Sequence, residues 1–321
     1  MFLEVADRAP LPVWIDREPI GYLLVELEGD EAEPPFGSRA KEVDAAAVRA
    51  LEPSIAPSVV RGWVSDTGRR LDPRALTVGL GLLAREAGAA IHHHAPVRSL
   101  RSDGDRVVGV VTDDGVMDAD VVVVAAGPWS SSLLETMGVR IPLTAARGWI
   151  VRVDPAEPVV HRLIERNGWR ESAWRRGAAE PLDARSFVST GLRAVGGALL
   201  NPHPDGSVLV GSSREPAVAP EPANPEVPRR QVAEAIELVP SLANATVRSA
   251  WWGIRPMSPD DRPIIGLVED GLVVATGHGS EGVLQAGGTA KLVAAIAQGE
   301  PAPFDQTAFD PARFDPPRFD P

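Results

Sequence analysis

The segment Gly277-His278-Gly279-Ser280-Glu281-Gly282 places three glycines between two patterns that predict regular structure. The apolar run Gly271–Thr276 before it predicts a buried strand, and the residues from Val283 to Gln298 predict a helix closed by Gly299. A glycine turn at the start of a helix offers free backbone N–H groups and the positive end of the helix dipole, which suit an anion or a ring that becomes electron-rich. The alternative is an ordinary strand–helix turn, in which the glycines serve only tight packing.

These glycines do not complete a dinucleotide site. Such a site needs a second strand after the helix, with an acidic residue for the ribose. From Gln298 onward, however, the chain consists mainly of Gly, Pro and Phe-Asp-Pro repeats. A second glycine pattern, Gly79 to Ala84, lies inside a predicted helix with no strand before it, and we interpret it as a coincidence.

Arg255 lies between bulky aromatic residues and a proline, in the run from Trp251 to Gly266. An extended, proline-flanked backbone pre-orients the guanidinium, which then suits bidentate binding of a substrate carboxylate. From spacing alone, a structural ion pair of Arg255 with Asp260 or Asp261 is an equal alternative. Arg262 is more simply explained as a surface partner of those carboxylates.

The histidines support no metal site. His92, His93 and His94 are consecutive, and on the strand predicted there, adjacent side chains point to opposite faces and cannot converge on one ion. We therefore predict no metal. His278 lies in the glycine turn and is a candidate catalytic residue, although a packing role is an equal alternative.

Composition excludes several classes of function. The chain has 321 residues, 44% of them hydrophobic, and a formal charge of −12 from 32 Lys+Arg and 44 Asp+Glu, which disfavours nucleic-acid partners. The absence of cysteine excludes disulfides, thiolate metal ligands and a cysteinyl nucleophile. The sequence also has no Gly-x-Ser-x-Gly elbow and no P-loop. We found no signal-peptide pattern and no apolar run long enough to span a membrane, so the cytoplasm is the expected compartment.

The elements that must position these residues follow from local patterns. We predict a strand over residues 20–28, a capped helix over 44–51, and a helix that starts at Asp72-Pro73 and ends near Gly88. Residues 89–127 predict a strand, two short strands turning at Asp103-Gly104 and Asp114-Gly115, and a buried strand. Residues 141–250 are less regular, with strands at GWIVRV and SVLVGSS and a helix in PRRQVAEAIELV. For the Phe-Asp-Pro tail we expect a surface-draped or disordered end.

Six motifs in a fixed order carry a family resemblance. They are Leu71-Asp-Pro-Arg-Ala-Leu, Ala95-Pro-Val97, Val123-Val-Ala-Ala-Gly127-Pro-Trp-Ser130, Trp252-Gly-Ile-Arg255-Pro, Asp260-Asp-Arg-Pro-Ile-Ile-Gly266 and Ala275-Thr-Gly-His-Gly-Ser-Glu-Gly-Val283. Together they resemble the FAD-dependent D-amino acid oxidase superfamily, in particular its glycine oxidase, sarcosine oxidase and D-amino acid dehydrogenase-like members. The resemblance extends from Gly21 to about Phe314.

The resemblance implies FAD as the cofactor and an amino acid or N-alkyl amine as the substrate. It implies hydride transfer from the substrate's CH–NH group to flavin N5, with Arg255 binding the substrate carboxylate. It also implies a set of cofactor-binding residues: Val97, Ala126, Gly127, Trp129, Gly277, Gly279, Ser280, Glu281, Gly282, Val283 and Leu284.

The chain also departs from the family pattern. Relatives open with a strand, a Gly-x-Gly-x-x-Gly turn and a helix, which hold the FAD pyrophosphate, whereas this chain begins MFLEVADRAP. We therefore expect a separate chain to supply that βαβ unit, or alternatively a flavin-free substrate-binding or accessory subunit, or an inactive N-terminally truncated fragment. Ser280-Glu281 stands where glycine oxidases carry a second carboxylate-binding Arg, which argues against a glycine-like substrate. Asp261 replaces a common Gly.

The resemblance also implies a fold. We expect an α/β (α+β) protein in which an incomplete glutathione-reductase-type FAD-binding domain is interleaved with a substrate domain built on a mixed or antiparallel sheet. The implied division gives residues 1–67 and 141–250 to the substrate domain, and residues 68–140 and 251–321 to the FAD-binding domain and tail. Without the first strand of its parallel sheet, the FAD-binding domain should expose apolar strand edges such as Val121–Ala126.

Overall fold

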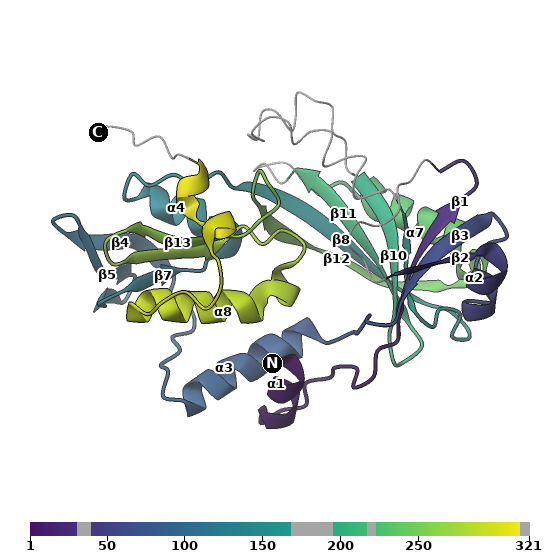
Figure 1. Ribbon diagram of the computed structural model, residues 1–321, viewed down its shortest axis with the longest axis horizontal. Helices are drawn as coiled ribbons and strands as arrows, with labels where there is room; N and C mark the ends of the chain where they lie inside the picture. The colour runs from purple at the N-terminus through teal and green to yellow at the C-terminus, as the bar shows by residue number, and fades with distance from the viewer. Residues whose placement is uncertain (31–39, 168–194, 217–222, 315–321) are drawn as a thin grey trace. The chain divides into compact units, whose positions relative to one another are not determined.

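The computed structural model describes residues 1–30, 40–167, 195–216 and 223–314 (Figure 1). They form two compact units, of which the first takes in residues 1–88, 147–167, 195–216 and 223–253 within the described ranges, and the second takes in 89–146 and 254–314. Residues 68–88 group with the first unit by compactness. The predicted cofactor domain and substrate domain are defined by which ligand each one contacts, and compactness does not test that. The predicted division therefore stays a prediction.

The first unit is built on a mixed eight-stranded sheet in the order β12-β8-β11-β10-β9-β1-β3-β2. The strands are β1 Tyr22–Leu27, β2 Lys41–Asp44, β3 Val59–Ser65, β8 Thr144–Asp154, β9 Leu163–Arg166, β10 Val195–Pro202, β11 Val208–Pro216 and β12 Thr246–Met257. β1 pairs parallel with β9 and antiparallel with β3. The core of this unit gathers buried aliphatic side chains such as Leu23, Val25, Ile164 and Leu200.

Local chemistry sets where the helices of the first unit begin. The Asp44 carboxylate accepts the Ala47 N–H at 2.8 Å and starts α2 (Ala45–Leu51), as predicted. Asp72 accepts the N–H groups of Arg74 and Ala75 and starts α3 (Pro73–Glu86). In the described part of this unit there are also the helices α1 (Phe2–Arg8) and α7 (Glu226–Leu238) and the 3-10 turn η2 (Pro240–Asn244).

Gly79 has a packing role on α3. A Cβ at this position would lie 2.9 Å from Cγ2 of Val13 and 3.1 Å from Cβ of Ala9, so the glycine admits the segment that follows α1. The interpretation of the Gly79 pattern as a coincidence is confirmed, because this residue lies inside a helix.

The second unit contains two three-stranded sheets, in the orders β13-β14-β7 and β4-β5-β6. The strands are β4 Val97–Asp103, β5 Arg106–Thr112, β6 Gly115–Asp118, β7 Val122–Val124, β13 Ile264–Glu269 and β14 Leu272–Thr276. The helices are η1 Gly127–Trp129, α4 Ser130–Glu135, α8 Gly282–Gln298, η3 Thr307–Phe309 and η4 Pro311–Phe314. α8 packs along β13 and β14, and β14 runs parallel to β7. The expected mixed α/β class is confirmed.

Two sequence-based expectations need correction or refinement. The strand expected from residue 89 begins only at Val97, so His92, His93 and His94 lie in an exposed turn, with His94 at φ +58°. The argument from alternating strand faces therefore does not apply to them. The tail is draped on the surface as far as Phe314, because Pro311 packs on Gly266 and Arg313 binds the Asp260 carboxylate at 2.9 and 3.0 Å. Residues 315–321 lie outside the described ranges.

Candidate functional site

The second unit brings the carboxyl ends of two parallel strands together. β7 is followed by Gly127 at φ +56°, and β14 is followed by Gly277 at φ +74°. The two turns are joined by a hydrogen bond of 2.9 Å from the Thr276 hydroxyl to the Gly127 carbonyl. In open α/β sheets, ligands bind in the crevice outside these strand ends. Two separate glycine motifs of the sequence therefore lie together at one edge of the sheet.

The turn after β14 also contacts the end of β12. The Gly279 N–H donates to the Pro256 carbonyl at 2.9 Å, and Met257 and His278 form an isolated antiparallel bridge. Arg255 directly precedes Pro256 in the strand and is partly buried. The predicted carboxylate-binding arginine and the predicted glycine turn thus lie next to each other.

Asp260, one of the carboxylates considered as a partner for Arg255 and Arg262, is bound by the tail. Both Asp260 carboxylate oxygens are engaged by Arg313, a residue of the tail. Arg262 contributes its backbone N–H to Asp260 at 3.2 Å. The side-chain pair expected for Arg262 is thus formed by Arg313, which sequence reasoning missed because the two partners are 53 residues apart.

The start of α8 has features that fit a planar ring. The helix begins at Gly282, and its N-cap residue Glu281 makes no side-chain capping hydrogen bond. The first amide N–H groups of a helix have no acceptor within it, and they carry partial positive charge. The adjoining apolar side chains are exposed, Val283 at 42% and Leu284 at 75%. A flat apolar group with an electron-rich edge would satisfy both features.

His278 is held within this turn. Its Nε2 lies 2.8 Å from the Thr289 hydroxyl of α8, and burial lowers the pKa of its imidazole. The ring is therefore neutral at pH 7 and joined to the helix. This geometry supports a role in fixing the turn, while the catalytic role remains a prediction.

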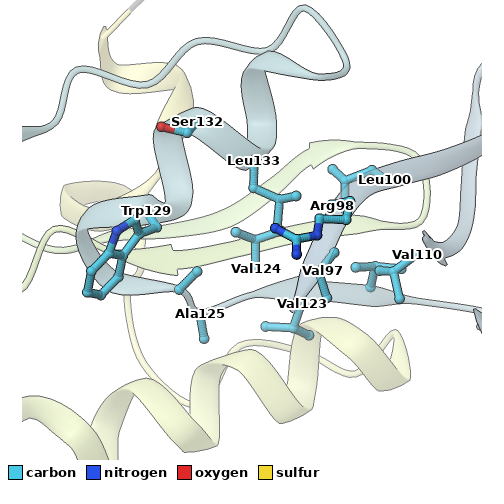
Figure 2. Close-up of a pocket in the computed structure, with 12 residues that line it drawn as sticks. Val97, Arg98, Leu100, Val110, Val123, Val124, Ala125, Trp129, Ser132 and Leu133 are labelled. Carbon is cyan, nitrogen blue, oxygen red and sulfur yellow. The ribbon is translucent and has the colours of Figure 1, made fainter. Parts of the chain in front are cut away.

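A cavity of about 590 Å³ runs along β7 (Figure 2). Of the predicted cofactor residues it brings together Val97, Ala126 and Trp129, the last with 67% of its surface exposed. The remaining lining residues were not predicted: Arg98, Leu100, Val110, Val122, Val123, Val124, Ala125, Ser132 and Leu133. The apolar run Val121–Ala126 was the only local signal for them, because the packing of β4 and α4 beside β7 is non-local.

Within residues 1–30, 40–167, 195–216 and 223–314, no cluster of three or more His, Asp or Glu side chains is arranged to hold a metal ion. No helix in the same ranges has the length and apolar character needed to cross a membrane.

Comparison with known proteins identifies the family. A family model described as FAD dependent oxidoreductase, DAO, matches residues 16–296. The glycine oxidase of Pseudomonas aeruginosa is 29% identical over 272 residues, which cover 82% of this chain and 67% of that protein. The bifunctional protein ThiO/ThiG of Trichormus variabilis is 27% identical over 88% of this chain and 38% of its own length. The D-amino acid dehydrogenase of Paramagnetospirillum magneticum is 28% identical over 92% of this chain and 67% of its own length.

The fold has counterparts among solved structures. The glycine oxidase of Geobacillus kaustophilus superimposes with a TM-score of 0.80 at 21% identity, over 97% of this chain and 79% of that chain. The L-proline dehydrogenase of P. horikoshii gives a TM-score of 0.77 at 19% identity. These two similarities show the fold. The family match over residues 16–296 shows that the chain belongs to the FAD-dependent oxidoreductase family, and with the relatives named glycine oxidase and D-amino acid dehydrogenase it is of the amino acid oxidase and dehydrogenase type.

Proposed function

We propose that this protein oxidises the CH–NH bond of an amino acid or N-alkyl amine. The observation that carries the proposal is the hydrogen bond from Gly279 to Pro256, which sets Arg255 beside the glycine turn. The relatives named glycine oxidase and D-amino acid dehydrogenase support this class of substrate. When bound, FAD supplies the acceptor for the hydride that leaves the substrate carbon.

The residues at the strand ends fit the flavin portion of FAD. Gly127 has no atom within 4 Å of the position where a Cβ would lie, so its surroundings leave room for a ligand. Gly277 and Gly279 adopt positive φ angles that keep the turn tight against Ile264 and Met257. We propose that Ala126, Gly127, Trp129 and the segment Gly277–Leu284 hold the ring, and that the N–H groups at the start of α8 stabilise negative charge on its edge.

Arg255 would bind and orient the substrate. A guanidinium pairs with a carboxylate through two parallel hydrogen bonds, and charge-assisted bonds of this kind contribute about 1.5–3 kcal/mol. Such a clamp fixes the α-carbon relative to the ring, which is the positioning that a hydride transfer needs. The neutral His278 leaves Arg255 as the predicted cationic group for the carboxylate.

The proposal includes a further polypeptide for the adenosine end of FAD. The family resemblance implies a strand, a Gly-x-Gly-x-x-Gly turn and a helix there, and we propose that a separate chain or segment supplies them. The substrate itself is a small molecule, and no nucleic acid is involved.

The variant Arg255→Lys tests the substrate role. Lysine keeps the charge but loses the bidentate geometry, so we expect KM for amino acids such as D-alanine or sarcosine to rise about tenfold or more, a loss of about 1.4 kcal/mol or more. The assay is the loss of visible flavin absorbance when substrate is mixed anaerobically with FAD-loaded protein.

The matched control is Arg262→Lys, an exposed arginine seven residues further along the same segment. We expect Arg262→Lys to leave KM unchanged and both variants to retain as much FAD as the parent chain. An unchanged KM in Arg255→Lys would contradict the proposed role of Arg255. Flavin that no amino acid or amine reduces in the parent chain would contradict the proposed reaction.

A further inference from the structure

The aspartates of two Phe-Asp pairs in the tail, five residues apart, form the same local structure. The Asp305 carboxylate accepts the Thr307 N–H at 2.9 Å, and the Asp310 carboxylate accepts the Ala312 N–H at 2.8 Å. Each aspartate thus satisfies a backbone N–H in the first two residues of a 3-10 turn, η3 or η4. Such side-chain to backbone hydrogen bonds give this proline-containing segment a defined conformation.

The two turns of the tail pack on β13 (Figure 1). Pro311 is buried, and its Cδ atom lies 2.5 Å from the position that a Cβ on Gly266 would take. Glycine at position 266 therefore admits the proline ring against the strand. This contact brings Arg313, two residues further on, to the loop of residues 258–263 between β12 and β13.

The guanidinium of Arg313 binds this loop at two places. Its Nε and Nη2 atoms donate to the two carboxylate oxygens of Asp260 at 2.9 and 3.0 Å, and Nη2 also donates to the Arg262 carbonyl at 3.0 Å. The same carbonyl accepts the Ser258 hydroxyl at 2.6 Å. Only 14% of the Arg313 side chain is exposed, so this bidentate pair differs from an ordinary surface ion pair. Arg313 therefore fixes both halves of the loop.

The loop that Arg313 holds contacts the glycine turn after β14. Asp261, the neighbour of Asp260, places its Oδ1 atom 3.1 Å from the position of a Cβ on Gly279. Directly before the loop, the Pro256 carbonyl accepts the Gly279 N–H at 2.9 Å. Gly279 is thus held both by the loop and by the end of the strand that leads into it.

We propose that Arg313 is a positioning residue for the glycine turn: by binding Asp260 it keeps Asp261 and Pro256 in contact with Gly279. Arg313 acts through the loop, because the side chain and the carbonyl that it binds there belong to residues outside the predicted flavin-binding set. A site holds a ligand well only when the groups behind it are fixed in turn. The consequence for flavin binding rests on the function proposed above, whereas the consequence for the turn itself does not.

Arg106 provides a matched control at the other end of β14. Like Arg313, it binds one carboxylate and one carbonyl: Nη1 donates to Asp270 at 2.5 Å, and Nη2 donates to the Asp120 carbonyl at 2.7 Å. Asp270 lies just before β14, whereas the glycine turn follows that strand. The Val107 N–H donates to the Asp270 carbonyl at 2.9 Å, so this amide reports on the Arg106 contact as the Gly279 amide reports on the Arg313 contact.

Amide hydrogen exchange in flavin-free protein, resolved by residue, tests the proposal. We expect Arg313→Gln to speed exchange at Gly279 about tenfold or more and to leave Val107 within about twofold of the parent chain, because the opening is local. Arg106→Gln should do the reverse. A residue that only adds to overall stability would change both amides together.

Two further variants test the route through Asp260. Arg313→Lys keeps the charge but loses the bidentate geometry, so exchange at Gly279 should be intermediate between the parent chain and Arg313→Gln. In an Asp260→Asn background the carboxylate partner is already lost. Arg313→Gln should therefore add little there, about twofold or less, as expected for two residues that act as one pair.

A flavin titration of the same proteins separates this inference from the proposed function. We expect Arg313→Gln to weaken FAD binding about fivefold or more and Arg106→Gln to bind FAD as the parent chain does. Unchanged exchange at Gly279 in Arg313→Gln, or equal acceleration of Gly279 and Val107 in both variants, would overturn the inference. Faster exchange at Gly279 with unchanged FAD affinity would support the positioning of the turn and contradict the placement of the flavin there.

Discussion

Asp261 and the glycines near it show how backbone conformation sets the candidate site. Asp261 adopts φ +59°, in the left-handed region where glycine is preferred and Asp is tolerated. The resembling family commonly has glycine at this position, and the positive φ angle of Asp261 explains that preference. Gly279 at φ +53° lies close by, since a Cβ on it would come within 3.1 Å of the Asp261 Oδ1 atom. The turn therefore depends on two neighbouring left-handed residues.

Gly279→Ala tests the turn against a matched glycine. Alanine at a positive φ costs about 1–2 kcal/mol of the free energy of unfolding, and Gly104→Ala, at φ +60° in the β4–β5 turn, should show this backbone cost alone, because a Cβ there would meet nothing within 4 Å. Only Gly279→Ala should weaken FAD binding, by about tenfold or more, because it crowds the turn beside Met257 and tilts the N–H groups. Thermal unfolding and a flavin titration measure the two effects. Equal FAD affinity in both variants would contradict the proposal that the turn containing Gly279 holds the flavin.

The residue scale is where sequence reasoning predicted most. Asp44, Asp72 and Gly299 were identified as helix ends from local chemistry, and each has that role. The extended backbone around Arg255 was also predicted, because Pro256 and the aromatic neighbours favour it locally. The turn at His92–His94 was not predicted. Its residue types do not distinguish a strand start from a loop, and Pro96 ends the loop only one residue before β4.

At the scale of elements, the buried carboxylate of Glu52 joins the end of α2 to the loop before β9 through hydrogen bonds. Glu52 is the C-cap residue of α2 and is fully buried, and its two oxygens accept the His161 N–H at 3.2 Å. Burial raises the pKa of Glu52, against the hydrogen bonds from His161, which lower it. The folded state therefore binds this proton more readily than the unfolded chain does.

This raised pKa gives a pH dependence with a definite sign. The stabilisation from the proton is fully present below the unfolded value of about 4.3 and is lost as the pH rises through the folded value. We therefore expect the unfolding free energy of the parent chain, relative to Glu52→Gln, to be higher at about pH 4 than at about pH 7. Urea unfolding at both pH values measures it. Val48→Ala, a non-ionising change in the same helix, should cost about 2 kcal/mol at either pH. A parent-minus-Gln difference that rises with pH would contradict the assignment.

Element positions in sequence were predicted better than element partners. The strands and turns of residues 97–118 and the helix α8 follow local periodicity and turn chemistry. The order β12-β8-β11-β10-β9-β1-β3-β2 could not be predicted, because it is fixed by contacts between segments far apart in the chain. The cavity along β7 could not be predicted for the same reason, since β4, β7 and α4 meet only in the folded unit. The ion pair between Arg313 and Asp260 also joins residues far apart in the chain and could not be predicted either.

At the scale of the whole molecule, each compact unit draws, within the described ranges, on two separate parts of the chain. The residues predicted to bind flavin all fall within one unit. Val97, Ala126, Gly127, Trp129, the segment Gly277–Leu284 and Arg255 all belong to the second unit. A ligand that contacts them would be bound by one unit, without requiring a particular arrangement of the two. We therefore expect flavin binding to depend on the glycine turns of the second unit and not on the eight-stranded sheet of the first unit.

The most direct test of this account is the visible difference spectrum of FAD titrated into the parent chain and into Gly279→Ala at equal concentration. We predict a saturable perturbation of the flavin absorption bands in the parent chain, because the ring moves from water to the turn between β14 and α8, with an apparent affinity about tenfold or more lower in Gly279→Ala. Gly104→Ala should behave as the parent. An unperturbed spectrum in the parent chain at saturating FAD, or identical titrations for all three proteins, would contradict the claim that the strand ends of the second unit hold the flavin.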